Sequence, residues 1–139
     1  MLIPKKVKHR KWQTRRIHPE KMVKPKEKGA TVSFGQFGLK ATSYSRVASN
    51  QIEAARRAMS RHLGKTGRSW IRVFPDMPYT KKPAEVKMGK GKGEIQGYHV
   101  PVKPGSIVFE VDGVTPEVAR ESLRKGGTKL PVKVKIVAR

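Results

Sequence analysis

NQIEAARRAMSRHLG, residues 50–64, is the stretch that predicts a helix most clearly and decides the fold. Asn50 can cap the start of this helix, with Glu53 as its capping-box partner, and Gly64 can take the left-handed position at its end. The apolar side chains at helical spacing are Ile52, Ala55, Met59 and Leu63. Because this stripe must be buried, the rest of the chain has to supply a surface that covers it.

Strand patterns lie on both sides of this helix. The segments with alternating or β-branched and aromatic residues are 31–34, 39–44, 69–74, 98–102, 107–111 and 132–136. Residues 35–38 are predicted to form the turn between the first two. Pro116 begins a second helix after a cap at Thr115, and Gly126 and Gly127 end it. We therefore expect an α+β fold, with two helices packed on a mainly antiparallel sheet of about five or six strands.

The composition indicates a polyanionic partner. Thirty-two Lys and Arg against ten Asp and Glu give the 139-residue chain a net charge of +22. A compact domain with this charge repels itself, which makes nucleic acid the leading partner and an anionic membrane surface the competitor. Cysteine is absent, which excludes disulfides, thiolate catalysis and zinc sites built on cysteine. No apolar run is long enough for a transmembrane helix, and we expect a cytoplasmic type of compartment.

Residues 1–28 are predicted to form a basic arm outside the domain. They hold eleven Lys or Arg and two Glu without apolar periodicity, so they cannot bury enough surface to fold alone. Trp12 in this arm can stack on a base or dock on the domain, and docking is the favoured interpretation. The remaining residues, 29–139, form a single domain.

A basic loop, residues 75–97, is predicted to project from that domain. Its centre is MGKGKG, residues 88–93, where glycines prevent regular structure and let the backbone approach a polyanion closely. Three prolines before it, at positions 75, 78 and 83, predict a stiff approach that is neither a helix nor a central strand. Taken alone, the loop is equally typical of a flexible hairpin tip.

The first helix also carries a basic ridge. It can be an ordinary solvated face in which Glu53 pairs with Arg57, or a surface that contacts phosphates. Because one glutamate cannot balance all these cations, phosphate contact is favoured. The ridge consists of Arg56, Arg57, Arg61 and Lys65.

Enzymatic sites are not supported by the spacing. Residues 64–66 match the end of a P-loop, but Met59 stands where that motif needs glycine, and Glu94 replaces the third glycine of a dinucleotide fingerprint. The four histidines have no metal-ligand spacing. Asp76 and Glu85 flank the basic loop, where local charge balance is favoured over a paired-carboxylate site. We expect no catalytic residue, metal or cofactor.

Several motifs together give the chain a resemblance to a known family. They are WIRVFPD (70–76), KPAEV (82–86) and MGKGKG (88–93), joined by MLIPK (1–5), VSFG (32–35), QIEAAR (51–56) and KLPVK (129–133). In this order they resemble the bacterial large-subunit ribosomal protein sixteen family over nearly the whole chain. One departure is Lys87, where many relatives carry arginine, whose planar fork can bond two oxygens at once.

The resemblance implies a structural constituent of the large ribosomal subunit, with peptide transfer left to RNA. It implies binding to 23S rRNA and to aminoacyl-site tRNA, with peptidyl-site tRNA as a second candidate, and contacts with neighbouring ribosomal proteins. No membrane and no homo-oligomer are expected, and a bacterial-type organellar ribosome stays an alternative to the cytoplasmic one. Together with the ridge, the expected rRNA-binding residues are Lys5, Lys6, Lys8, Arg10, Lys11, Arg15, Arg16, Arg56, Arg57, Arg61, Lys65, Lys81 and Lys82. Those expected near both rRNA and tRNA are Lys87, Met88, Gly89, Lys90, Gly91, Lys92 and Gly93.

Overall fold

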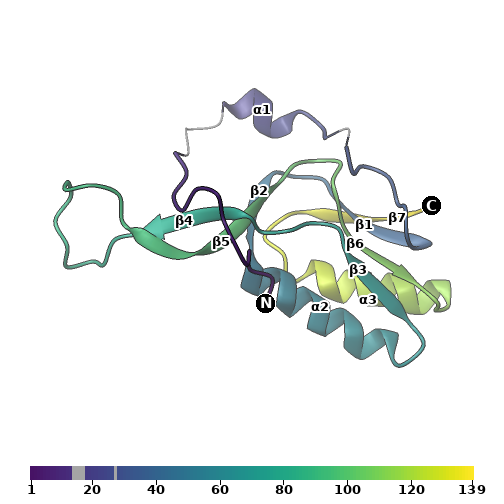
Figure 1. The fold of residues 1–139 in the computed structure, drawn as a ribbon. Helices are drawn as coiled ribbons and strands as arrows, with labels where there is room; N and C mark the ends of the chain where they lie inside the picture. The colour runs from purple at the N-terminus through teal and green to yellow at the C-terminus, as the bar shows by residue number, and fades with distance from the viewer. Residues whose placement is uncertain (14–17, 27) are drawn as a thin grey trace.

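The computed structural model describes residues 1–13, 18–26 and 28–139 and confirms the α+β class (Figure 1). Its strands divide between two antiparallel sheets, in the orders β3-β6-β1-β7 and β2-β5-β4. The helices are α1 (Pro19–Val23), α2 (Ser49–Leu63) and α3 (Pro116–Gly127). The strands are β1 (Phe37–Ala41), β2 (Ser45–Ala48), β3 (Arg68–Ile71), β4 (Met77–Lys81), β5 (Glu94–Val102), β6 (Ile107–Asp112) and β7 (Val134–Ala138).

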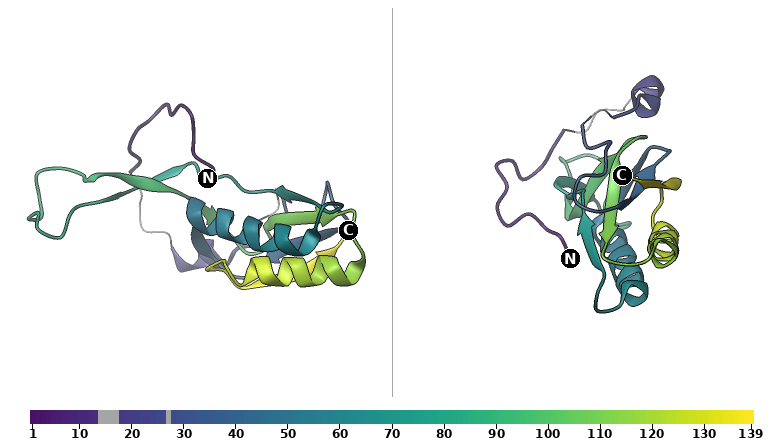
Figure 2. Two further views of the ribbon diagram at one scale, coloured as in Figure 1. Left: turned by 90° about the horizontal axis from the view of Figure 1, so that it is seen from below. Right: turned by 90° about the vertical axis from the view of Figure 1, so that its right-hand side faces the viewer.

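The core lies between the four-stranded sheet and the two long helices, which run side by side over one of its faces (Figures 1 and 2). The predicted stripe of α2 is fully or almost fully buried there. Phe109 of β6 pairs with Leu39 of β1 in the sheet register, and both are completely buried. The helices approach closely because α3 presents Gly126 to Met59 of α2. The amphipathic pattern therefore predicted this layer correctly.

The predicted strand over residues 31–34 is wrong. The structure begins its first strand at Phe37, inside the stretch expected to be a turn, and leaves residues 31–36 without regular structure. The reason is a long-range contact, because the carboxylate of Glu110 accepts the backbone N–H groups of Ser33, Phe34 and Gly35. N–H groups bonded in this way cannot form a strand ladder.

The two ends of α2 differ in how well the sequence predicted them. The helix begins at Ser49 rather than after an Asn50 cap, and the side chain of Gln51 accepts the N–H of Ala48 at 2.9 Å. The expected capping box of Asn50 and Glu53 is therefore wrong, and Glu53 is left for other partners. At the other end Gly64 has a φ of +66°, as the prediction of a glycine stop requires.

The projecting loop is a β-hairpin with an irregular tip. Met77–Lys81 forms β4, so the prediction of a loop is wrong here. The prolines are expected to exclude a helix and a central strand, and β4, with Pro78, is an edge strand. β5 pairs with β4 and with β2, and the hairpin extends away from the rest of the fold (Figure 1). Residues 82–93 at its tip form no strand. Within the described residues, no helix is long and apolar enough to cross a membrane.

Candidate nucleic-acid interface

The N-terminal arm is anchored at its first residues and exposed beyond them. Ser49 at the start of α2 donates its hydroxyl to the carbonyl of Leu2 at 2.7 Å, and Leu2 packs against the core. The five predicted RNA-binding cations that follow, Lys5, Lys6, Lys8, Arg10 and Lys11, are all exposed. Predicted Arg15 and Arg16 lie outside the described residues. Further along, residues 19–23 form the short helix α1, which the sequence pattern did not predict and which buries no residue.

The arm meets the hairpin tip. Lys11 donates its Nζ to the carbonyl of Lys92 at 3.1 Å, and Lys92 donates its Nζ to the carbonyl of Trp12. The side chain of Trp12, predicted to dock, stays 40% exposed, and its backbone makes the contact. Two segments that lie 80 residues apart in the sequence are thereby joined through lysines. They form one basic surface instead of two.

The tip presents its lysines on an exposed backbone. Gly89 and Gly91 have φ angles of +98° and +90°, and Lys90 between them has a φ of +51°. No atom lies within 4 Å of a Cβ placed at either glycine. Glycine is therefore favoured at these positions by the positive φ angle and not by a lack of space. Met88 is 98% exposed. Of the other predicted tip residues and the adjoining lysines, Lys81, Lys87, Lys90, Gly91 and Lys92 are exposed and Lys82 and Gly93 are partly exposed.

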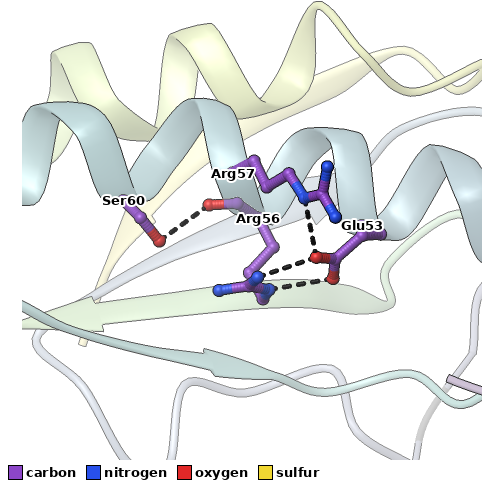
Figure 3. Close-up of polar contacts among 4 residues, drawn as sticks. All are labelled: Glu53, Arg56, Arg57 and Ser60. Atoms are coloured by element: carbon purple, nitrogen blue, oxygen red, sulfur yellow. Dashed lines mark hydrogen bonds and ion pairs between the residues drawn. The ribbon is translucent and has the colours of Figure 1, made fainter. Parts of the chain in front are cut away.

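On α2 the predicted ridge divides into a paired half and an unpaired half. Arg56 donates to both carboxylate oxygens of Glu53, at 2.9 and 2.7 Å, while Arg57 donates to one of them at 3.0 Å (Figure 3). Hydrogen bonds from Arg56 and then from Arg57 lower the pKa of Glu53 to about 2. Among the described residues, Arg61 and Lys65 have no acidic partner within 4.0 Å.

This pairing orients guanidinium groups without using all their donors. Arg56 engages two of its five N–H groups, and its side chain remains 41% exposed. Ser60 also donates its hydroxyl to the carbonyl of Arg56 at 2.9 Å (Figure 3). The ridge therefore keeps free, directed donors of the kind that phosphate oxygens accept. The ion pair and the phosphate surface, weighed as alternatives in the sequence, are compatible in the structure.

Sequence reasoning missed an aromatic group on the four-stranded sheet. Phe34 stacks on Trp70, with ring centroids 6.3 Å apart and planes inclined by 21°, and the guanidinium of Arg72 lies 4.8 Å from the Phe34 centroid. Arg72 also pairs with the buried Glu110. The alternating pattern of residues 69–74 was the available signal, because a single arginine stands among aromatic and β-branched residues there.

A metal site in the described part of the chain would need acidic side chains and histidines close together. Among these residues, no group of three His, Asp or Glu side chains could hold a metal ion. The acids Glu53 and Glu110, whose pKa values are lowered, are held by arginines and backbone N–H groups. These contacts keep both acids ionised and leave neither ready to take up a proton at neutral pH.

Comparison with known proteins gives a consistent family assignment. The profile of the family described as ribosomal protein L16p/L10e matches residues 4–137. Proteins named large ribosomal subunit protein uL16 are 55% identical in Afipia carboxidovorans, 53% in Nitrobacter winogradskyi and 55% in Cereibacter sphaeroides. Each alignment covers all of this chain and 98% of the relative. The chain therefore belongs to the ribosomal protein L16p/L10e family.

Proposed function

We propose that this protein is a structural constituent of the large ribosomal subunit that binds 23S rRNA and contacts tRNA near the aminoacyl site. In this role it supports organisation of that site and assembly of the subunit, and it catalyses no reaction itself. The observation that carries the proposal is the contact between arm and hairpin tip through Lys11 and Lys92. It gathers exposed cations from both appendages on one side of the fold, where a single folded polyanion can reach them.

The chemistry of recognition follows from the groups in each part. Lysine ammonium groups on the arm and tip neutralise phosphates as point charges, and the exposed tip backbone adds peptide N–H donors. The arginines of α2 offer planar donors that suit phosphate oxygens. Lys87 at the tip keeps the charge of the arginine common in relatives and loses its two-oxygen geometry. We infer that the tip binds RNA mainly through the positive charge of its lysines.

The partners proposed for the assembled state are 23S rRNA, aminoacyl-site tRNA and neighbouring large-subunit proteins. Peptidyl-site tRNA is a second tRNA candidate, and neither a membrane nor a second copy of the chain is required. The ribosome in question is cytoplasmic or belongs to an organelle with a bacterial-type ribosome. In each case the +22 charge is neutralised by RNA rather than by protein.

Co-sedimentation with purified large subunits tests the proposal. The protein should sediment with the subunit at low salt and leave it only at high salt, because each neutralised phosphate steepens the salt dependence. Protein that stays free of ribosomes at low salt would contradict it. Competition between folded 23S rRNA and duplex DNA is the second arm, and a preference for the DNA would indicate a free nucleic-acid binder instead.

A further inference from the structure

Residues 33–36 are hydrogen-bonded to β6, an inner strand of the four-stranded sheet. Glu110 is completely buried and accepts the N–H groups of Phe34 at 2.6 Å and Gly35 at 3.0 Å, while Ser33 shares its N–H between both carboxylate oxygens at 3.2 Å. The guanidinium of Arg72 completes this set of donors. Burial raises the pKa of Glu110, but these hydrogen bonds outweigh burial, and the pKa lies below its usual value. The carboxylate therefore acts as a fixed, charged anchor for the segment.

The segment lies on the face of the sheet that α2 and α3 leave uncovered. Leu39 and Phe109 face the helices. Gly38 precedes Leu39, Glu110 follows Phe109, and these two residues pair with each other and face the opposite way. A Cβ at Gly38 would come within 2.7 Å of Val32, so this glycine lets the segment lie flat on the sheet. Figure 2 shows both long helices on the other side of the sheet. The backbone of Phe34 is thus bonded to the uncovered face of the sheet through Glu110.

The ring of Phe34 is presented outward by this support. It is 58% exposed even though its own N–H is fixed, and it stacks on Trp70 beside the guanidinium of Arg72. Arg68, Trp70 and Arg72 alternate along β3 and its continuation, so they share one face of the strand. A rigid aromatic surface is thereby flanked by the exposed Arg68 on one side and by Arg72, which is paired with Glu110, on the other.

We propose that this aromatic surface, made by Phe34, Trp70 and Arg72, is a stacking site for an unpaired RNA nucleobase. An aromatic ring beside a guanidinium binds the π-face of any base, and the exposed Arg68 next to it suits a neighbouring phosphate. The charge of the chain favours RNA as the occupant over an apolar partner protein. The inference rests on the proposed function, since it assigns one base-stacking position to the same RNA.

A fluorescence experiment on the full chain tests this site. Trp12 and Trp70 are the two tryptophans, so a Trp12→Phe background makes Trp70 the reporter. The probes are a ten-nucleotide oligoadenylate and an abasic ribose-phosphate oligomer of equal length and charge. The oligoadenylate should quench Trp70 and bind about 5-fold or more tightly than the abasic oligomer, because stacking on one aromatic group has at least that effect. Phe34→Ala should remove this preference, while Phe34→Tyr should keep it.

Two further variants separate stacking from loss of structure. Phe34→Leu keeps an apolar side chain of similar size without a π-face, so it should lose the preference while keeping the thermal transition. Phe74→Ala is the matched control, because Phe74 is also exposed, at 47%, and has no aromatic partner among the described residues. It should retain the preference. Equal loss in Phe34→Ala and Phe74→Ala would overturn the proposal.

The outcomes distinguish this site from the ribosomal role. Wild-type protein that sediments with large subunits but binds both oligomers equally would refute the stacking site alone, and the surface would then be free to contact a neighbouring protein. Wild-type protein that prefers oligoadenylate but stays free of ribosomes would refute the ribosomal role and support the stacking site.

Discussion

The four-stranded sheet buries and pairs a charged side chain, whereas in the described parts of the two basic appendages most charged side chains are exposed and lack acidic partners. In the sheet, the carboxylate of Glu110 is buried and satisfied by four protein groups. At the hairpin tip, residues 82–93 hold four lysines and one glutamate, and two of those lysines donate to backbone carbonyls. A buried charge must be satisfied by the fold, so the fold loses stability when one partner is removed. Cations without acidic partners are instead available to an external anion. The difference predicts which substitutions act on stability and which act on RNA binding.

Removing the buried carboxylate should have the largest effect. Glu110→Ala leaves Arg72 without its partner and the N–H groups of residues 33–35 unpaired, which should cost about 3–5 kcal/mol of unfolding free energy. Urea unfolding at neutral pH measures this loss. Glu121→Ala is the matched control, because its ion pair with Arg124 is on the surface and should change stability far less than Glu110→Ala does. Similar losses in both variants would contradict the comparison.

Closing the gap between the two long helices should have the next largest effect. A Cβ at Gly126 would meet the side chain of Met59 at 2.6 Å, so Gly126→Val should destabilise the fold by about 1–3 kcal/mol through overpacking. Arg120→Val on the exposed part of α3 introduces the same side chain without that clash. Thermal unfolding of the two variants compares them. Because valine is a better helix former than glycine, propensity alone would not lower the midpoint of Gly126→Val. A fall no larger than that of Arg120→Val would contradict overpacking against Met59.

The correct and incorrect predictions of helices and strands show where sequence patterns are informative. The stripe on α2 predicted its own burial, because helical periodicity is a local property that the core only has to match. The strand expected at residues 31–34 failed because its N–H groups bond a carboxylate 75 or more residues away, which no local pattern reveals. β4 was missed because proline excludes only a central strand, and Met77–Lys81 lies at an edge.

The exposure of the proposed interface cations was predictable from the sequence, and their arrangement was not. Charge counting placed cations on the arm, the ridge and the tip, since unbalanced charge must be exposed. The contact of Lys11 with Lys92 depends on how the hairpin projects past the arm, which only the assembled sheets determine. The same holds for Phe34, whose exposure follows from the anchor at Glu110.

Neutralising the tip should leave stability unchanged and weaken RNA binding. Lys90→Ala with Lys92→Ala removes two exposed cations that contact no core residue, so the thermal transition should be retained. Affinity for 23S rRNA should fall about 10-fold, with a salt slope smaller by about 1 for each lysine. Lys133→Ala with Lys135→Ala removes the same charge from the exposed face of β7 and its approach. An equal loss of affinity in this control, or loss of the thermal transition in the tip variant, would contradict a distinct role for the tip.

The smallest effect is expected at Glu53, a carboxylate with two arginine partners that lies at the surface of α2. Its pKa is lowered to about 2 by Arg56 and Arg57, so the stability it adds is fully present above about pH 4.5 and is lost as the pH falls towards 2. Glu53→Gln should therefore cost about 0.5 kcal/mol at pH 7 and progressively less between pH 4.5 and 2. Urea unfolding of both proteins at pH 7, 4 and 3 measures the difference, which 0.5 M salt should reduce further because the pair is partly exposed. A loss as large as that of Glu110→Ala, independent of pH, would mean that the ridge belongs to the core and that its arginines are structural rather than reserved for phosphate.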